Sequence, residues 1–406
     1  MERIFREEAG RLTASLVRLL GDFDLAEELV ADAVVEALQH WPRDGVPERP
    51  ASWLLTTARR KGLDRLRRGA VYRKKLELLE RLPQDPPRET DDRLRLIFTC
   101  CHPVLARDAQ VALTLRAVVG LSSEEIARAF LVPAETLAKR IVRAKQKIVG
   151  AGVPYRVPEE HELSARLDEV LTVIYLVFNE GYVSTAGDAP IRRDLARDAE
   201  WLAGMLARLM PEEPEPMGLL ALIRLHLARW PARLDGSGKL MLLEHQDRSL
   251  WDRPAIRDAV ALIERAAALR RPGRYQLEAM IAAVHCEAES WEATDWPQIM
   301  ALYSVLIGLD PSPIVRLSRA IARRYVDGPA AALADADLLS DALRGYYLFH
   351  ATRAELRRAL GQHAEAARED AAALALTRNG GERALLQERI SAPRAVKRVF
   401  VRFEAP

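Results

Sequence analysis

Basic side chains recur at helical spacing in residues 121–148, LSSEEIARAFLVPAETLAKRIVRAKQKI. At 100° per residue, the second half of this stretch separates into two stripes. The apolar stripe contains Leu137, Ile141, Ala144 and Ile148. The opposite arc contains Thr136, Lys139, Arg140, Arg143 and Lys147. Because Arg and Lys reach guanine edges and phosphates in the major groove, this pattern predicts a DNA-reading helix. The alternative is a solvated basic face on an ordinary helical hairpin.

The residues before this basic helix predict a second helix and a tight turn. Ser122 can cap the first helix, and Glu125 three residues later completes a capping box. We expect Leu131 and Val132 to form the turn, and Pro133 to start the second helix because its fixed φ suits a first turn. Together these signals predict a helix-turn-helix.

A second basic helix is predicted at residues 50–68, PASWLLTTARRKGLDRLRR, opened by Pro50 and Ser52. Its basic face contains Arg60, Lys61, Arg67 and Arg68, with Trp53 on the same side. Leu55, Leu63 and Leu66 point away from that face. Cations of this kind bind phosphates with salt-dependent affinity, and an aromatic ring beside them can stack on an unpaired base. For Trp53, a role as a core anchor is slightly favoured over stacking.

Cys100, Cys101 and His102 are the residues that most invite a metal interpretation. A tetrahedral zinc site needs four ligands, usually with two to four residues between paired cysteines, and Cys286 stands apart beside His285. We therefore expect incidental cysteines on a buried helix, with redox sensing as the weaker alternative. The sequence also lacks a nucleophile elbow, a phosphate loop or a dinucleotide fingerprint, so it predicts neither a metal or cofactor nor an enzyme.

The composition indicates the class of fold that positions these basic helices. The 406 residues are rich in Ala, Leu and Arg and poor in aromatics, which favours an all-helical protein of several domains. No apolar run is long enough to span a membrane, and the N-terminus lacks a signal core, so a cytoplasmic protein without a membrane partner is expected. Residues 1–158 carry excess basic charge, whereas the remainder is net acidic. A basic front suggests a polyanion partner.

The front half divides at loops rich in proline and charge. An amphipathic helix is expected over 24–41, with Val30, Val34, Ala37, Leu38 and Trp41 on its apolar side. The stretches 81–92 and 151–162 read as linkers. Beyond 163 the chain is expected to be helical, and Gly328 and Gly361 lie 33 residues apart, each before an Ala-rich helix. This spacing suggests tetratricopeptide-like repeats, although two unrelated helical hairpins would also explain it.

Residues 24–41, 50–68 and 121–148, in this order and with a proline-rich linker between the last two, resemble an extracytoplasmic-function (group 4) sigma factor of bacterial RNA polymerase. They look like its core-binding helix, its helix for the −10 element and its −35-reading helix-turn-helix. LIFTCCHPVL at 96–105 and YLVFNEGY at 175–182 look like sequences of a subgroup with a large tetratricopeptide-like extension.

The resemblance implies a role for each matching residue. Glu28, Leu29 and Asp32 face the coiled coil of the polymerase β′ subunit, where acidic residues beside an exposed apolar position suit a mixed interface. The expected −10 residues are Trp53, Arg60, Lys61, Arg67 and Arg68. The expected −35 residues are Glu135, Thr136, Lys139, Arg140 and Arg143.

The expected fold is all-α, with two small sigma domains, the second carrying the helix-turn-helix, and a helical-repeat-like C-terminal domain. The expected limits are 1–70 for sigma region 2, 71–91 for a linker, 92–150 for sigma region 4 and 163–406 for the extension. The expected partners are core RNA polymerase and promoter DNA, and the extension is expected to regulate the sigma part through intramolecular or protein contacts.

Two interpretations stay open beside this one. The first is a stand-alone helix-turn-helix regulator whose helical repeats bind a peptide or protein, and the weaker one is a repeat adaptor with a fortuitously basic front. Asn179, Glu180, Gly181 and Tyr182 close an apolar helix, with Gly181 as a candidate left-handed residue after it. These four residues are either purely structural, which is favoured, or an inter-domain hinge.

Overall fold

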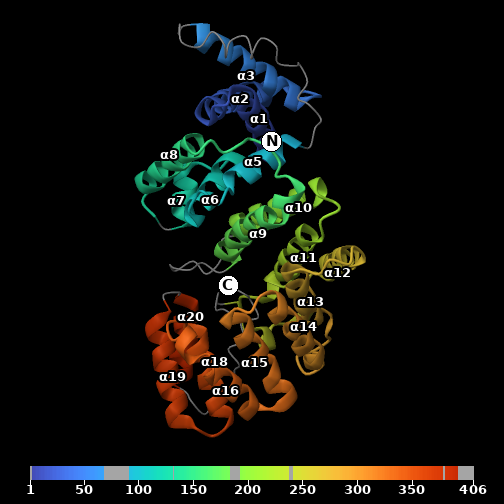
Figure 1. Cartoon of the computed structure of the whole chain (residues 1–406), viewed down its shortest axis with the longest axis vertical. Helices are drawn as coiled ribbons and strands as arrows, with labels where there is room; N and C mark the ends of the chain where they lie inside the picture. Colours follow the sequence, from blue (N-terminus) through green and yellow to red (C-terminus); the bar gives the residue numbers. More distant parts are fainter. Residues whose placement is uncertain are drawn as a thin grey trace. The chain divides into compact units, whose positions relative to one another are not determined.

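The computed structural model of the chain describes residues 2–67, 91–130, 132–182, 193–236, 241–377 and 380–391. Every regular element in those ranges is a helix, which confirms the predicted all-α fold class. The helices form two compact units, Met1–Val177 and Phe178–Pro406. Figure 1 shows their order along the chain.

The first unit begins with three helices that pack on one another: α1 (Glu2–Leu20), α2 (Phe23–Asp44) and α3 (Pro50–Arg67). Asp22 caps α2, because its side chain accepts a hydrogen bond from the Leu25 amide at 3.1 Å. Leu12, Leu16, Leu29, Leu54 and Leu55 are among the buried side chains that fill the core between them. Hydrophobic burial of these three amphipathic faces therefore stabilises the start of the chain.

The next helices of the same unit are α5 (Asp91–Cys100), α6 (Arg107–Thr114), α7 (Ser123–Ala129) and α8 (Ala134–Gly150). A single π-helical turn, η2 (Leu115–Val119), extends α6 and ends at Gly120, whose φ of 85° is the left-handed conformation that glycine tolerates. α8 packs on both α6 and α7, so the helix-turn-helix rests on α6.

The two sets of helices in the first unit are joined through α1, which packs on α5 and on η2. The Tyr155 hydroxyl donates to the Ala14 carbonyl at 2.9 Å, and Asp92 forms an ion pair with Arg18 at 2.9 Å. Asp92 also accepts a hydrogen bond from the Ser15 hydroxyl at 3.0 Å. These polar contacts join residues more than 70 positions apart in sequence. They contribute to the single compact unit that the first 177 residues form.

Helix α9 (Glu160–Tyr182) contains the division between the two units, which lies between Val177 and Phe178. Its first half packs in the first unit, where the Arg166 guanidinium donates to the Phe98 carbonyl and Glu169 pairs with Arg107. The compact unit therefore extends beyond residue 163, the expected start of the extension, and the domain limits stay a prediction.

The expected break of this helix at Gly181 is wrong. α9 continues to Tyr182, and Gly181 does not have a positive φ. Its role is close packing, because a Cβ atom there would lie 2.4 Å from the backbone nitrogen of Ala196. Glu180 and Tyr182 are buried and Asn179 is half-buried, so these four residues belong to the packed end of α9, and a hinge at this place stays a prediction.

The second unit continues as a series of helices that pack mainly on their neighbours in sequence. They are α10 (Arg193–Leu209), α11 (Pro214–Ala228), α12 (Arg253–Ala268), α13 (Arg274–Glu287), α14 (Trp296–Leu309), α15 (Pro313–Asp327), α16 (Pro329–Asp337), α17 (Ser340–Leu343), α18 (Tyr347–Ala359), α19 (His363–Leu376) and α20 (Gly380–Ser391). Short 3₁₀ turns, η3 (Trp230–Ala232), η4 (Leu243–His245) and η5 (Arg248–Leu250), connect α11 to α12.

Gly328 and Gly361, the pair that suggested a repeat, each lie at the turn of a helical hairpin. Their φ angles are 89° and 76°. Gly328 joins α15 to α16, Gly361 lies between α18 and α19, and the helices of each pair pack together. The 33-residue spacing thus corresponds to two successive hairpin turns, and tetratricopeptide identity stays a prediction.

A buried ionic network holds the last helices together. Asp370 of α19 pairs with Arg389 of α20 and with Arg358 of α18, and both Asp370 and Arg389 are almost fully buried. Glu355 of α18 extends the network, pairing with Arg358 at 3.1 Å and with Arg324 of α15 at 3.3 Å. These pairs join α15, α18, α19 and α20 into one ionic cluster. Removing one member of such a cluster leaves an uncompensated buried charge.

The α1–η2 contact generates a stability prediction. A Cβ atom at Gly10 would lie 2.6 Å from the Val118 carbonyl oxygen, whereas one at Gly150 of α8 meets nothing within 4 Å. We expect Gly10→Ala to destabilise the protein by about 1–3 kcal/mol through overpacking. Gly150→Ala, the matched control, should be neutral or slightly stabilising because Ala favours helix. Thermal unfolding of the two variants measures the difference, and equal melting temperatures would contradict the α1–η2 packing.

Candidate nucleic-acid interface

The predicted capping box of the helix-turn-helix is present. The Ser122 hydroxyl accepts from the Glu125 amide at 3.1 Å, and the Glu125 carboxylate accepts from the Ser122 amide at 2.7 Å. Leu131 of the predicted turn lies outside the described residues, while the Val132 amide donates to the Ala127 carbonyl at 3.0 Å. Pro133 is the residue before α8 rather than its first residue, because its ψ of 136° is extended.

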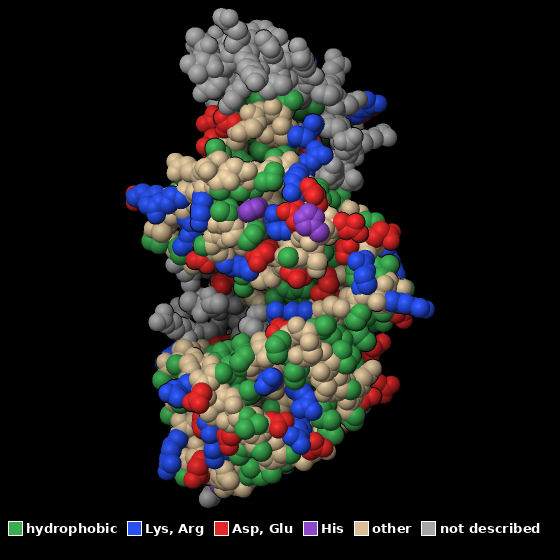
Figure 2. Space-filling model, viewed as in Figure 1, with side chains coloured by type: hydrophobic (Ala, Val, Ile, Leu, Met, Phe, Trp, Pro, Cys, Tyr) green, Lys and Arg blue, Asp and Glu red, His purple; other side chains and the backbone are tan. Residues whose placement is uncertain are grey.

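Helix α8 has one buried and one exposed stripe. The buried side chains are Leu137, Ile141, Ala144, Lys145 and Ile148. Glu135, Thr136, Lys139 and Arg143 are exposed, and Arg140 is half-buried. Figure 2 shows Lys and Arg side chains at the edge of the molecule where Figure 1 places α8. The exposed stripe therefore offers side chains of the type that contact bases and phosphates.

Two cations of this stripe have acidic neighbours. Lys139 pairs with Glu135 at 2.6 Å, one helical turn earlier, and Arg140 lies 3.5 Å from Asp108 of α6. Glu135 and Asp108 are themselves exposed. Exposed ion pairs contribute little free energy, since solvent screens both charges. A phosphate can therefore replace these carboxylates at small cost.

On α3, the structure brings Arg60 and Lys61 together at a single carboxylate, Glu36 of α2. The distance from the Lys61 Nζ to the Glu36 Oε2 is 2.7 Å. The hydrogen bond from Lys61, with a further contribution from Arg60, lowers the pKa of Glu36 against the opposing effect of burial. Glu36 is therefore ionised at neutral pH. The side chain of Arg67 and the whole of Arg68 lie outside the described residues.

Trp53 is half-buried in the first turn of the same helix, α3. Its ring packs edge-on against Trp41 with 5.5 Å between ring centroids. It also lines a surface hollow of about 890 Å³, together with Glu36, His40, Arg49, Ser52 and Arg60 among others. Trp53 thus combines a packing contact with access to an open hollow, and a stacking role stays a prediction.

The expectation that Leu29 of α2 offers an exposed apolar contact is wrong. Leu29 is 0% exposed, because it belongs to the core between α1, α2 and α3. Leu38, expected on the buried side, is 51% exposed, and Val35 is 54% exposed. Val35 lies seven residues after Glu28 and three after Asp32, so helical spacing places all three on one side of α2. The exposed apolar neighbour of these two acids is therefore Val35 rather than Leu29, and the exposed Leu38 follows about one turn after Val35.

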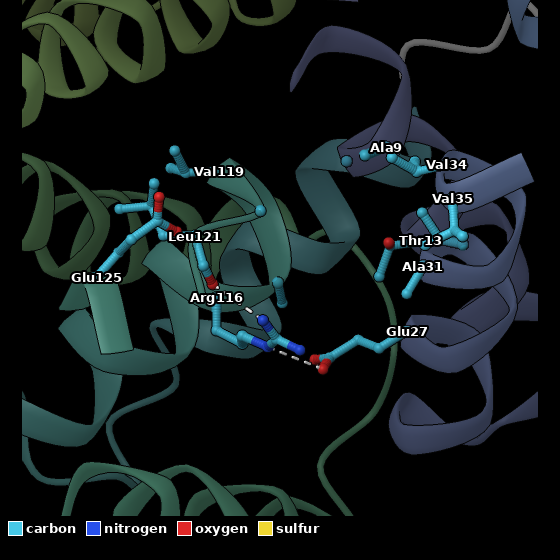
Figure 3. Close-up of a pocket in the computed structure, with 14 residues that line it drawn as sticks. Ala9, Thr13, Glu27, Ala31, Val34, Val35, Arg116, Val119, Leu121 and Glu125 are labelled. Atoms are coloured by element: carbon cyan, nitrogen blue, oxygen red, sulfur yellow. Dashed lines mark hydrogen bonds and ion pairs between the residues drawn. The ribbon is translucent and has the colours of Figure 1, made fainter. Parts of the chain in front are cut away.

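Sequence reasoning also missed the ion cluster between α2 and the helix-turn-helix domain. Glu27 of α2 pairs with Lys145 of α8 at 3.0 Å and with Arg116 of η2 at 3.2 Å, and Lys145 also pairs with Asp24 at 2.8 Å. Figure 3 shows Arg116 reaching across an apolar hollow of about 400 Å³ towards Glu27. In the sequence, the one signal for this ion cluster was Lys145, a cation on the edge of the apolar stripe of α8.

The Cys100–Cys101 pair lies in the interior. Burial raises the pKa of both thiols, that of Cys101 to about 12, and the Cys101 sulfur lies 3.4 Å from the Thr114 hydroxyl. Buried neutral thiols are poor nucleophiles and poor metal ligands. In the part of the chain that the structure describes, no group of three or more His, Cys, Asp or Glu side chains could hold a metal ion. None of the described helices combines the length and apolar character of a membrane span.

These helices and surfaces define an all-helical DNA-binding protein with a capped helix-turn-helix and a second cationic helix. Residues 4–71 match the protein family described as Sigma-70 region 2, and residues 95–148 match Sigma-70, region 4. Residues 166–267 match a family of unknown function. The chain is also 43% identical over 386 residues to an uncharacterized protein of Rhizobium meliloti (strain 1021), across 92% of this chain and 91% of that relative.

The chain belongs to the sigma-70 family and is a sigma factor of the extracytoplasmic-function type with a C-terminal extension. Sigma-70 regions 2 and 4 serve transcription initiation together with core RNA polymerase and promoter DNA, and they are DNA-binding modules rather than enzymes. The region 2 match favours this assignment over a stand-alone helix-turn-helix regulator, because such a regulator needs no core-binding helix.

Proposed function

We propose that this sigma factor reads its promoter with the exposed stripe of α8 at the −35 duplex and the basic face of α3 at the −10 element. The observation that carries the proposal is the division of α8, whose apolar stripe is buried while Thr136, Lys139 and Arg143 face outward. Base-edge contacts from Arg specify sequence, and phosphate contacts from Lys and Arg fix the register. On α3, Trp53 beside a hollow supplies a surface on which an unpaired base can stack.

Charge reversal on α8 tests the −35 contacts. We expect Arg140→Glu/Arg143→Glu to reduce −35-dependent initiation at least about 100-fold, because each reversal removes an attractive contact and adds repulsion from phosphate. In vitro transcription with added core polymerase measures this, on promoters mapped from a genomic library. Core affinity should be unchanged, and Arg316→Glu, which reverses an exposed charge on α15 of the second unit, should initiate normally. Wild-type transcription by the double variant would rule out α8 as the reading helix.

For core binding, we propose that the outer face of α2 contacts the coiled coil of the β′ subunit. This face presents the carboxylates of Glu28 and Asp32 beside the exposed side chains of Val35 and Leu38. Apolar side chains surrounded by charge are typical of the centre and rim of a protein interface. Leu29 supports this face from beneath, because it packs in the core of the three-helix domain.

Aspartate substitutions on α2 test that face. We expect Val35→Asp/Leu38→Asp to weaken binding to core polymerase about tenfold or more, since both residues lose apolar contact area and gain a desolvation cost. Val46→Asp is the matched control, because Val46 is exposed by 44% in the loop after α2 and lies off the proposed face. Titration of labelled protein against core polymerase gives the affinities. Equal losses in both variants would refute the assignment.

For the C-terminal extension, we propose a regulatory role that acts on the sigma part or on polymerase. Two observations support it: α9 is continuous from the first unit into the second, and the chain after residue 158 is net acidic whereas the part before it is net basic. An acidic helical domain attached to basic DNA-reading helices is suited to modulate their encounter with DNA, and successive helical hairpins offer surfaces for protein partners.

Truncation of the chain tests the role of the extension. A chain ending at Tyr182 keeps α9, and with it the contacts of Arg166 and Glu169 to the first unit. We expect this chain to change promoter output at least about threefold in cells at matched protein level, because the regulatory input is lost. Reporter transcription measures the effect, with immunoblots as the level control. Output equal to that of the full chain would argue against a regulatory extension.

A further inference from the structure

The Glu36 carboxylate has a position unlike those of the acids that pair with the exposed stripe of α8. Its side chain is only 15% exposed, while those of its two partners, Arg60 and Lys61, are 59% and 41% exposed. In contrast, the acids that pair with Lys139 and Arg140 of α8 are largely exposed and contact one cation each. Glu36 is therefore a mostly buried carboxylate that pairs with two more exposed cations.

This arrangement brings together two side chains of α3 that would otherwise point in different directions. Consecutive residues of a helix point about 100° apart, so Arg60 and Lys61 have no reason to converge on their own. The two carboxylate oxygens of Glu36 contact one cation each, Oε1 with Arg60 and Oε2 with Lys61. Both side chains have many rotamers, and a shared partner limits that freedom before DNA arrives.

The pairing also changes the electrostatic balance at the hollow that Trp53 and Arg60 line. Two cations alone would contribute a local charge of about +2, and the ionised carboxylate reduces it to about +1. Non-specific affinity for nucleic acid depends on the number of phosphates that the protein neutralises, whereas selectivity depends on contacts to bases. Glu36 thus lowers the non-specific affinity for nucleic acid. It also preserves the placement of Arg60 and Lys61, on which selectivity depends.

We infer that Glu36 is a positioning residue for promoter opening, which holds Arg60 and Lys61 together at the −10-reading face and limits their binding to unselected phosphates. This inference rests on the proposed role of α3 at the −10 element. Its partner class is single-stranded promoter DNA, whose phosphates compete with the carboxylate for both cations. The nearby hollow with Trp53 accepts the base, so phosphate and base contacts are made at neighbouring points.

The test is Glu36→Gln in the full-length chain, because glutamine keeps the size of the side chain and removes its charge. The first probe is a fluorescent (dT)20 oligonucleotide, bound by the free protein over a range of salt concentrations. We expect about three- to tenfold tighter binding, and a salt slope steeper by about 0.7 for each additional phosphate engaged. Asp44→Asn is the matched control, since it removes the same charge from an exposed position at the end of the same helix, outside the hollow and without a pair to Arg60 or Lys61.

The second probe is the holoenzyme on a mapped promoter and on the same fragment with its −10 element scrambled. The ratio of open complexes on the two should fall at least about threefold for Glu36→Gln and stay unchanged for Asp44→Asn. A further variant, Arg60→Gln/Lys61→Gln, removes both partners. In that background Glu36→Gln should change (dT)20 affinity no more than Asp44→Asn does. Thermal unfolding of each variant shows whether it folds as stably as the wild type, so a loss of the ion pairs is distinguished from a loss of folding.

The outcomes separate the two hypotheses. If wild-type holoenzyme initiates selectively but Glu36→Gln and Asp44→Asn behave alike with both probes, the positioning role of Glu36 is overturned while the sigma function stands. If wild-type protein with core polymerase fails to initiate at any promoter, the proposed function of α3 fails, and this inference fails with it. Tighter (dT)20 binding and lost promoter selectivity in Glu36→Gln alone would establish the role.

Discussion

A helix that buries one stripe of side chains must present the opposite stripe outward, and the proposed DNA-reading surfaces of this protein depend on that constraint. In α8 the buried stripe is aliphatic apart from Lys145, and the outward one carries Lys139 and Arg143. In α3 the buried Leu54 and Leu55 fix the helix on the core of the first unit, which leaves Arg60 exposed. Hydrophobic burial thus determines where the charge is displayed, although it contributes no contact to DNA itself.

Helix α2 is the organising element of the first unit, because its acids reach cations on three other elements. Glu27 pairs with Arg116 of η2 and Lys145 of α8, and Glu36 pairs with Arg60 and Lys61 of α3. The same helix presents its mixed outer face to the solvent. One helix therefore presents the proposed core-binding face and also holds the helix-turn-helix domain and the proposed −10-reading helix through short ionic contacts. Salt screens the exposed contacts with α3 more than the buried contact between Glu27 and Lys145.

The second unit is stabilised in a different way. Its last helices are joined by a buried cluster centred on Asp370 and Arg389, and its earlier helices pack through aromatic contacts such as the stacked rings of Trp296 and Tyr325, 3.9 Å apart. Buried ionic clusters of this kind depend on good geometry, because the cost of desolvating the charges is offset only when every member is paired. Successive hairpins turning at Gly328 and Gly361 give a layered helical architecture.

The sequence by itself determined the helical class, the capped helix-turn-helix and the two stripes of α8, because these follow from local spacing and capping chemistry. It could not identify Leu29 as core or Leu38 as surface, since both lie near the boundary of an apolar stripe and only packing against α1 and α3 decides which is covered. Only the tertiary structure could pair Glu36 with Arg60 and Lys61, or Glu27 with Lys145, because these partners are distant in sequence. An ion pair of that kind depends on where two helices meet, and periodicity carries no information about that.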